Sequence, residues 1–158
     1  MSGFFNQAYF RQLTQYLLGL VFRHPVTGTN IVPILSDGSI VLVRRCDTGL
    51  WALPGGMVKW REDLPTTLKR ELAEETGLDL VSIQRLVGVY SSPERDSRVH
   101  SICVVVAVQA KGNILVQDTG EISEAKAFSL DTLPKKEQLS YDNFQQLQDY
   151  LNSSTAVA

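Results

Sequence analysis

The stretch from Gly55 to Leu78, GGMVKWREDLPTTLKRELAEETGL, decides the fold class of this chain and most of its chemistry. A glycine pair opens it, and leucines that recur every four residues then indicate one helix with a buried stripe. Pro65 suits the first helical turn, Asp63 is the better candidate for the N-cap, and Gly77 suits the position after the last turn. The sequence therefore predicts a loop that leads directly into a helix.

Three carboxylates, those of Glu71, Glu74 and Glu75, fall within about 100° of arc on this helix. Like charges at this spacing repel one another and raise each other's pKa unless a cation compensates. They form either a solvated acidic face or an all-oxygen site for a hard cation, which Mg²⁺ suits and Mn²⁺ would also fit. The glycine pair favours the cation site, because glycine lets the backbone approach a metal or phosphate closely.

The spacing of the charged residues in this stretch resembles that of a known protein family. The pattern G-x5-E-x7-R-E-L-x-E-E-x-G-L, which runs from Gly56 to Leu78, resembles the Nudix box at every defining position. The preceding LWALPGG and the order of the predicted strands are also similar to that family. The resemblance implies an α/β fold, namely a Nudix-type α/β/α sandwich with a mixed β-sheet, and hydrolysis of a nucleoside diphosphate linked to another group.

The resemblance also implies roles for individual residues. Metal binding, directly or through water, would fall to the carbonyl of Gly55 and to the carboxylates of Glu71, Glu74 and Glu75. Arg70 and Glu62 would orient these carboxylates from behind the metal ligands. The metal would neutralise the diphosphate, activate a water and stabilise the leaving phosphate, whereas the acids alone would repel the substrate.

The general base is expected either in this helix or in the downstream loop QDTGEISEAKAF. Some members of the family take it from the helix of the box and others from a loop ahead of a late strand. We favour Glu121 over Glu124, because Gly120 precedes it and a glycine-bearing loop can swing in when substrate binds. Otherwise both glutamates are surface charges.

The segment YSSPERDSRVH points to the substrate. Pro93 follows Leu78 by fifteen residues, which is similar to the ADP-ribose pyrophosphatase branch of the family. Arg95 and Arg98 in this segment would clamp phosphates or reach a terminal ribose. The alternative is a solvated loop in which the two arginines pair with Asp96.

Two arginines and a tryptophan lie just ahead of the glycine pair. Arg44 and Arg45 end a predicted strand, and because side chains alternate along a strand, one of them should face the site. The resemblance favours a phosphate contact from that arginine, and the sequence leaves open which one it is. Trp51 either stacks on a base or packs beneath its loop, and packing is favoured.

Length, charge and hydropathy exclude several classes of protein. The 158 residues suit a single domain with a real core, and the net charge of −2 argues against a general nucleic-acid binder. The longest apolar run near the N-terminus, LLGLVF, is too short to span a bilayer, so no membrane partner is expected. Cys46 and Cys103 lie far apart without a histidine cluster, which indicates a reducing, cytoplasmic compartment.

The chain divides into three predicted parts. Residues 1–24 form an amphipathic helix that either caps the core or packs on a second subunit, so a homodimer is one expectation. Residues 25–151 form the Nudix domain, and residues 152–158 form a flexible tail.

Within the domain, predicted strands and helices alternate irregularly, which favours a mixed sheet covered by helices on both faces. HPVTGTN (residues 24–30) is typical of a turn, and IVPIL and SIVLVRR are expected to form a hairpin through SDGS. VSIQRLVGVY and EAKAFSL are further strands, and the unbroken apolar run ICVVVAV predicts a central strand buried on both faces. Apolar residues at helical intervals predict a closing helix over residues 137–151.

The leading hypothesis is a Mg²⁺-dependent pyrophosphohydrolase that cleaves ADP-ribose or a related nucleoside diphosphate sugar to a nucleoside monophosphate and a sugar phosphate. The first alternative is an enzyme that cleaves (deoxy)nucleoside triphosphates to sanitise the nucleotide pool. A non-catalytic nucleotide sensor on the same scaffold is the third hypothesis. The intact set of box carboxylates argues against the sensor.

Overall fold

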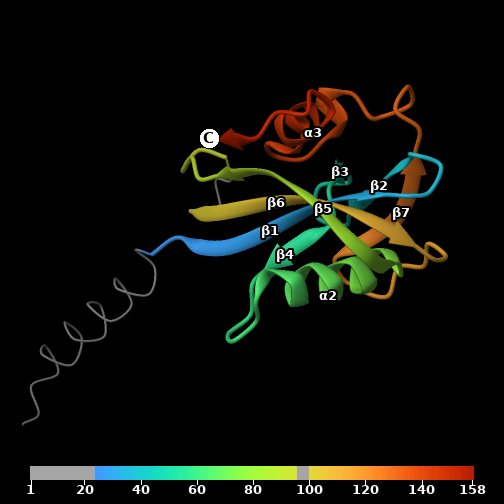
Figure 1. Cartoon of the computed structure of the whole chain (residues 1–158), viewed down its shortest axis with the longest axis horizontal. Helices are drawn as coiled ribbons and strands as arrows, with labels where there is room; N and C mark the ends of the chain where they lie inside the picture. Colours follow the sequence, from blue (N-terminus) through green and yellow to red (C-terminus); the bar gives the residue numbers. More distant parts are fainter. Residues whose placement is uncertain (1–23, 96–99) are drawn as a thin grey trace, which may run out of the picture.

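A computed structural model of the chain describes residues 24–95 and 100–158. In this part of the chain a mixed sheet lies between two helices, with α2 (Leu64–Thr76) below it and α3 (Asn143–Leu151) above it in Figure 1. The expected three-layer α/β/α arrangement is therefore confirmed. The predicted helix over residues 1–24 lies, apart from its last residue, outside the described residues.

The sheet is built around β1 (Val26–Ile34), which pairs in parallel with β6 (Ser101–Lys111) along its whole length. The strand order is β3-β2-β1-β6-β5-β8, while β4 pairs with β1 and β7 pairs with β2. The remaining strands are β2 (Ile40–Arg45), β3 (Trp51–Ala52), β4 (Gly55–Met57), β5 (Asp79–Tyr90), β7 (Ile122–Phe128) and β8 (Ala156–Val157). The predicted β1–β2 hairpin and the central position of β6 are confirmed.

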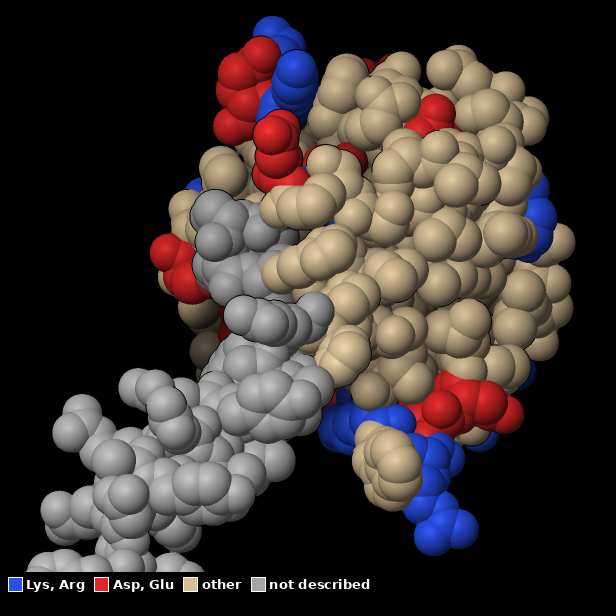
Figure 2. Space-filling model, turned by 90° about the vertical axis from the view of Figure 1, so that its left-hand side faces the viewer, with Lys and Arg blue, Asp and Glu red and all other residues tan. Residues whose placement is uncertain are grey.

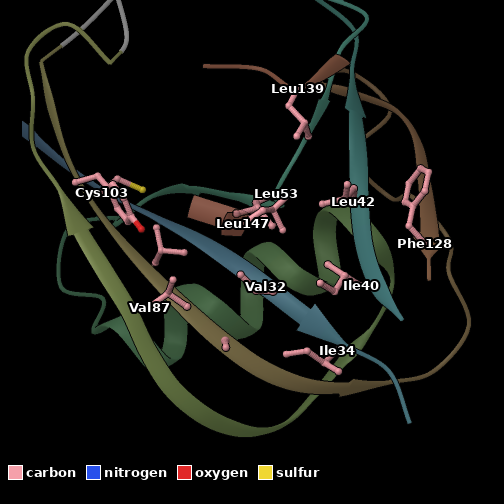
Figure 3. Packing of buried hydrophobic residues seen from close by; sticks show 13 residues of the cluster. Val32, Ile34, Ile40, Leu42, Leu53, Val87, Cys103, Phe128, Leu139 and Leu147 are labelled. Atoms are coloured by element: carbon pink, nitrogen blue, oxygen red, sulfur yellow. The ribbon is translucent and has the colours of Figure 1, made fainter. Parts of the chain in front are cut away.

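Side chains that alternate along β1 and β2 divide the core between the two helices. Ile31 and Val41 join a cluster with the α2 leucines Leu68 and Leu72 on one face of the sheet. On the other face, Val32, Ile34, Ile40 and Leu42 pack with Leu147 of α3 (Figure 3). Because successive strand residues point to opposite faces, two neighbouring strands supply both halves of the core.

Helix α2 begins and ends where its sequence predicts. The Asp63 carboxylate accepts a hydrogen bond from the Thr66 N–H at 2.9 Å and so caps the helix. Gly77 ends it in the left-handed region, with a φ of 73° and an N–H that bonds to the Ala73 carbonyl. These caps fix which residues occupy each helical position, and hence which face carries the glutamates.

The predicted turn at residues 24–30 is wrong, because Val26–Asn30 belong to β1. This half of β1 pairs with β6 on one side and with β4 on the other. Partners on both edges satisfy its backbone groups, and this tertiary pairing outweighs the local preference of Gly28 and Asn30 for turns.

The tail also differs from its prediction, because Ala156–Val157 forms β8 and pairs in parallel with β5 at Gly88 and Val89. Arg85 on β5 secures the segment, since its guanidinium donates to the carbonyls of Tyr150 and Ser154, each at 2.9 Å. The end of the molecule that carries the C-terminus in Figure 1 is covered mainly by uncharged side chains (Figure 2). Across residues 24–95 and 100–158, no helix has the length and apolar character needed to cross a membrane.

Replacing Arg85 by lysine should lower the free energy of unfolding by about 1–3 kcal/mol, because one ammonium nitrogen does not span the two carbonyls that the guanidinium reaches with separate nitrogens. Urea denaturation followed by circular dichroism measures the change. Lys111→Ala, at an exposed position on β6, is the control and should shift the midpoint little. Equal stability of Arg85→Lys and the parent would contradict the anchoring role.

Candidate active site

The glycine pair and the α2 carboxylates meet where β4 lies against the helix. The Gly55 N–H donates to the Glu75 carboxylate at 2.8 Å. A Cβ added to Gly56 would lie 2.5 Å from Oε1 of Glu71, and one added to Gly55 would collide with the backbone of β1. Glycine is therefore required at position 55 by the close approach of β1, whereas a side chain at position 56 would displace the Glu71 carboxylate.

One guanidinium, that of Arg70, holds three glutamates. Its Nε and Nη2 each lie 2.9 Å from a carboxylate oxygen of Glu62. Its Nη1 donates to Oε1 of Glu71 at 2.6 Å and to Oε2 of Glu74 at 3.2 Å. Hydrogen bonds from Arg70 lower the pKa of Glu62 to about 2, and those to Glu62 raise the pKa of Arg70 above its usual value. Both groups are charged at neutral pH, and the cluster is fixed in orientation.

Glu75 is buried, with 6% of its surface exposed. Burial raises the pKa of Glu75 to about 8, although the Gly55 N–H lowers it, and the nearby charges of Glu71 and Glu121 raise it further. Burial also raises the pKa of Glu71, against the opposing effect of Arg70. Negative charge at this point is therefore under-compensated by the protein's own groups, and a bound cation would relieve it.

The donor set fits a hard divalent cation, because it consists of oxygens only. The carboxylates of Glu71, Glu74 and Glu75 and the carbonyl of Gly55 would hold the ion. No three acidic, histidine or cysteine side chains within residues 24–95 and 100–158 are already arranged as a metal site. Glu71 and Glu74 bond instead to Arg70, and Glu75 bonds to Gly55. When bound, the ion would supply charge neutralisation for a diphosphate and an activated water.

The loop that carries Glu121 is attached to the last turn of α2. The N–H groups of Gln117 and Asp118 both donate to the main-chain carbonyl of Glu74, at 3.0 and 2.9 Å. The carboxylate of Asp118 then accepts the N–H groups of Gly120 and Glu121. The carbonyls left unpaired at the end of a helix thus receive the loop. This docking brings Glu121 close enough to raise the pKa of Glu75.

A cleft of about 920 Å³ joins these carboxylates to other polar side chains. Of the site residues predicted from the sequence, it is lined by Gly55, Arg70, Glu71, Glu74, Glu75, Arg45, Arg95 and Glu121. Arg45 rather than Arg44 faces the cleft, and the register of β2 with β7 shifts between the two. Arg45 pairs with Asp47 at 2.6 Å. Arg98 lies outside the described residues.

Other predicted site residues lie off this cleft. Arg44 donates to the Gly49 carbonyl and lies 3.9 Å from the carboxylate of Glu124. Trp51 meets Phe128 edge to face, with ring centroids 4.9 Å apart, which is the packing arrangement that the sequence favoured. Pro93 is exposed and does not contribute to the cleft wall.

Several residues of the cleft wall were not singled out by the sequence. They include Lys59, Asp118, Tyr141, Asp142 and Asn143. The side-chain carbonyl of Asn143 accepts the N–H of Leu53 at 2.7 Å, which ties the start of α3 to the segment between β3 and β4, just ahead of the glycine pair. An Asp–Asn pair before a helix is a capping signal in sequence, and it gives no sign that the same residues face a cleft.

The chain belongs to the NUDIX family, since its residues 24–150 match the family model of the NUDIX domain. Hydrolases of this family generally need a divalent metal. The chain is similar to the ADP-ribose pyrophosphatase of Methanocaldococcus jannaschii, with 37% identity over 144 residues that cover 89% of this chain and 80% of the relative.

The chain is also similar in structure to solved members of the NUDIX family. The chain resembles an ADP-ribose pyrophosphatase from Streptococcus suis at 27% identity and a TM-score of 0.68, covering 85% of this chain and all of that one. It shares its fold with the NUDIX domain of Shewanella oneidensis NrtR, solved with ADP ribose, at 23% identity and a TM-score of 0.71. That match covers 89% of this chain and 97% of the other.

Replacing Glu75 by glutamine should stabilise the metal-free protein at alkaline pH while abolishing metal-dependent activity. Between the ordinary pKa of 4.5 and about 8, the folded protein retains a proton that the unfolded chain has released. The free energy of unfolding therefore falls as pH rises through this window, and the deficit is complete above it. The amide carries no charge and escapes this loss.

Thermal melts in a chelator at pH 5 and pH 8.5 measure the effect. We expect Glu75→Gln to raise Tm at pH 8.5 by about 5 °C and to change it little at pH 5. Glu137→Gln, at an exposed site, is the matched control. A Tm difference that is the same at both pH values would contradict the assignment of Glu75 as the uncompensated carboxylate.

Proposed function

We propose that this protein is a Mg²⁺-dependent pyrophosphohydrolase that cleaves ADP-ribose or a related nucleoside diphosphate sugar. The products would be AMP and ribose 5-phosphate, or the corresponding nucleoside monophosphate and sugar phosphate. The observation that carries this proposal is the group of α2 carboxylates against the glycine pair, of which Glu75 is buried and short of positive charge, at the wall of a cleft of about 920 Å³. The similarity of the chain to two ADP-ribose pyrophosphatases supports the choice of substrate.

The charge of the cleft supports a need for metal. Its described lining includes seven carboxylates and four cationic side chains. Arg70 is already bonded to two of those carboxylates, Glu71 and Glu74, and to Glu62 outside the lining. A diphosphate entering such a cleft would be repelled unless a divalent cation came with it. Mg²⁺ suits the oxygen ligands and Mn²⁺ is the expected substitute.

The residues of the site have two proposed kinds of role, as metal ligands and as groups that position those ligands. Metal binding is proposed for Gly55, Glu71, Glu74 and Glu75. Arg70 and Glu62 would hold these carboxylates in place. Arg45, on the cleft wall, is the candidate for a phosphate contact, and Glu121 is the candidate general base because its loop places it near Glu75.

We further propose that the protein works as a homodimer in the cytoplasm. The dimer rests on the apolar stripe of residues 1–24, which light scattering of the full chain would test against a chain that lacks residues 1–23. The compartment rests on the two cysteines, Cys46 and Cys103, which lie far apart in the sequence without a histidine cluster.

A substrate panel tests the proposed activity. With Mg²⁺, we expect ADP-ribose and nucleoside diphosphate sugars to be hydrolysed, and a chelator to abolish turnover. Dinucleoside polyphosphates, NADH and oxidised deoxynucleoside triphosphates complete the panel, and chromatography of the products identifies the bond that is cleaved. Rapid triphosphate turnover with inert ADP-ribose would refute the substrate class while retaining the metal-dependent chemistry.

Substitutions at two glutamates of the same segment, Glu121 and Glu124, test which residue is the general base. Glu121→Gln should lower kcat about 100-fold or more, because the loss of a positioned base costs that much in typical cases. Glu124→Gln removes an equal charge from a residue that faces Arg44 away from the cleft, and it should leave kcat within about twofold. Equal effects of the two substitutions would exclude Glu121 as the base.

A further inference from the structure

One part of the cleft wall is built around a single ion pair that does not involve α2. Arg95 follows β5, and Asp142 directly precedes α3. The guanidinium meets the carboxylate through two bonds, Nε to Oδ2 at 2.9 Å and Nη2 to Oδ1 at 3.1 Å. Nη1 also donates to the Ser101 hydroxyl at 2.6 Å. The side chains of Arg95 and Asp142 are only 11% and 19% exposed, so this Arg95–Asp142 cluster is rigid and largely shielded.

The pair changes what Arg95 can bind. Burial alone would lower the pKa of Arg95, but the hydrogen bonds and charge interactions with Asp142 and Cys103 together outweigh burial and raise the pKa, so the guanidinium is charged and the pair is intact. An arginine already matched by a carboxylate offers a phosphate little net attraction, because the phosphate would also approach the negative charge of Asp142. The cluster is therefore poorly suited to the phosphate contact that the sequence suggested for Arg95.

The surroundings do not add a net charge to the cluster. The thiol of Cys103 lines the same wall, and burial raises the pKa of Cys103 to about 11, so the thiol is neutral at physiological pH. The guanidinium of Arg45 lies 5.7 Å from the Tyr141 ring and is itself bonded to Asp47. The wall around Asp142 is polar and locally balanced in charge.

The Arg95–Asp142 ion pair has no net charge, and its remaining donors and acceptors suit the binding of hydroxyl groups. A carboxylate oxygen has lone pairs beyond those that Arg95 uses, and a guanidinium has more N–H donors than Asp142 and Ser101 occupy. Donors and acceptors therefore lie side by side on the cleft wall. A sugar hydroxyl is both donor and acceptor, and two neighbouring hydroxyls can satisfy the two kinds of group together.

We propose that the Arg95–Asp142 cluster binds the hydroxyls of the sugar attached to the diphosphate, and that Asp142 thereby selects nucleoside diphosphate sugars over nucleoside triphosphates. The inference rests on the proposed function, because it needs the diphosphate to lie at the α2 carboxylates in the same cleft. A triphosphate would direct its terminal phosphate toward Asp142, where like charges repel. Asp142 is a specificity-determining residue, and Arg95 positions it.

Asp142→Asn tests the assignment through KM. The amide retains the shape of the side chain but loses its charge, so its hydrogen bonds to the sugar weaken and Arg95 loses its counter-charge. We expect the KM for ADP-ribose to rise about tenfold with kcat within about twofold, which is typical of the loss of a charged hydrogen bond. The KM for dATP should fall, because Arg95 becomes available to its terminal phosphate. Asp131→Asn, an exposed carboxylate outside the cleft lining, should change neither value.

A second measurement compares the KM values of two substrates within the same protein, so a smaller amount of folded variant does not affect it. In the parent protein, the ethyl ester of ADP, which has a diphosphate and no second sugar, should show a KM about tenfold above that of ADP-ribose. In Asp142→Asn this difference should shrink to within about twofold. A variant that raises the two KM values equally, or leaves both unchanged, overturns the inference.

Failure of the inference can be told apart from failure of the proposed function. If the parent protein hydrolyses ADP-ribose and the ratio of the two KM values is the same in Asp142→Asn, only the role of Asp142 is refuted. If the parent hydrolyses triphosphates and no nucleoside diphosphate sugar, the proposed function and the inference are refuted together.

Discussion

The rest of the site depends on the hydrogen bonds that Arg70 donates to the carboxylates of Glu62, Glu71 and Glu74. Carboxylates at helical spacing repel one another, and a helix that carried them without a counter-charge would be destabilised. The guanidinium reduces that repulsion for Glu62, Glu71 and Glu74, while Glu75 stays buried and short of positive charge. The fold is thus stable before metal arrives, yet one carboxylate still favours a cation.

Steric fit complements this electrostatic arrangement. The glycines of β4 let the strand come within hydrogen-bonding distance of Glu75 and leave room for Glu71. Leu68 and Leu72, which lie beside Glu75 on the helix surface, pack against β1 and β2 and fix the rotation of α2. Glu71 and Glu75 are thereby buried against β4, whereas Glu74 stays partly exposed. Core packing, a tight backbone approach and one arginine together define the geometry of the site.

How much of this the sequence predicts depends on the range of the interactions. The bounds of α2 and its acidic face follow from local spacing, and both are found in the structure. The contact between Arg95 and Asp142 joins residues 47 positions apart, which no local pattern can indicate. Likewise, Arg45 lines the cleft beside a shift in the register of β2 with β7, and pairing on two edges converts a predicted turn into the first half of β1. The sequence thus predicts the chemistry of the helix better than the walls of the cleft.

Glu74 contributes to the molecule twice, once through its side chain and once through its main chain. Its carbonyl receives the N–H groups of Gln117 and Asp118, whereas its carboxylate is directed to Arg70 and the cleft. Main-chain bonds do not depend on the identity of the side chain, so architecture and chemistry are separable at this position. Over evolutionary time a chain of this design could lose or alter its reactivity at residue 74 and still keep the 112–121 loop attached. Such a scaffold is well suited to acquiring new roles without first having to refold.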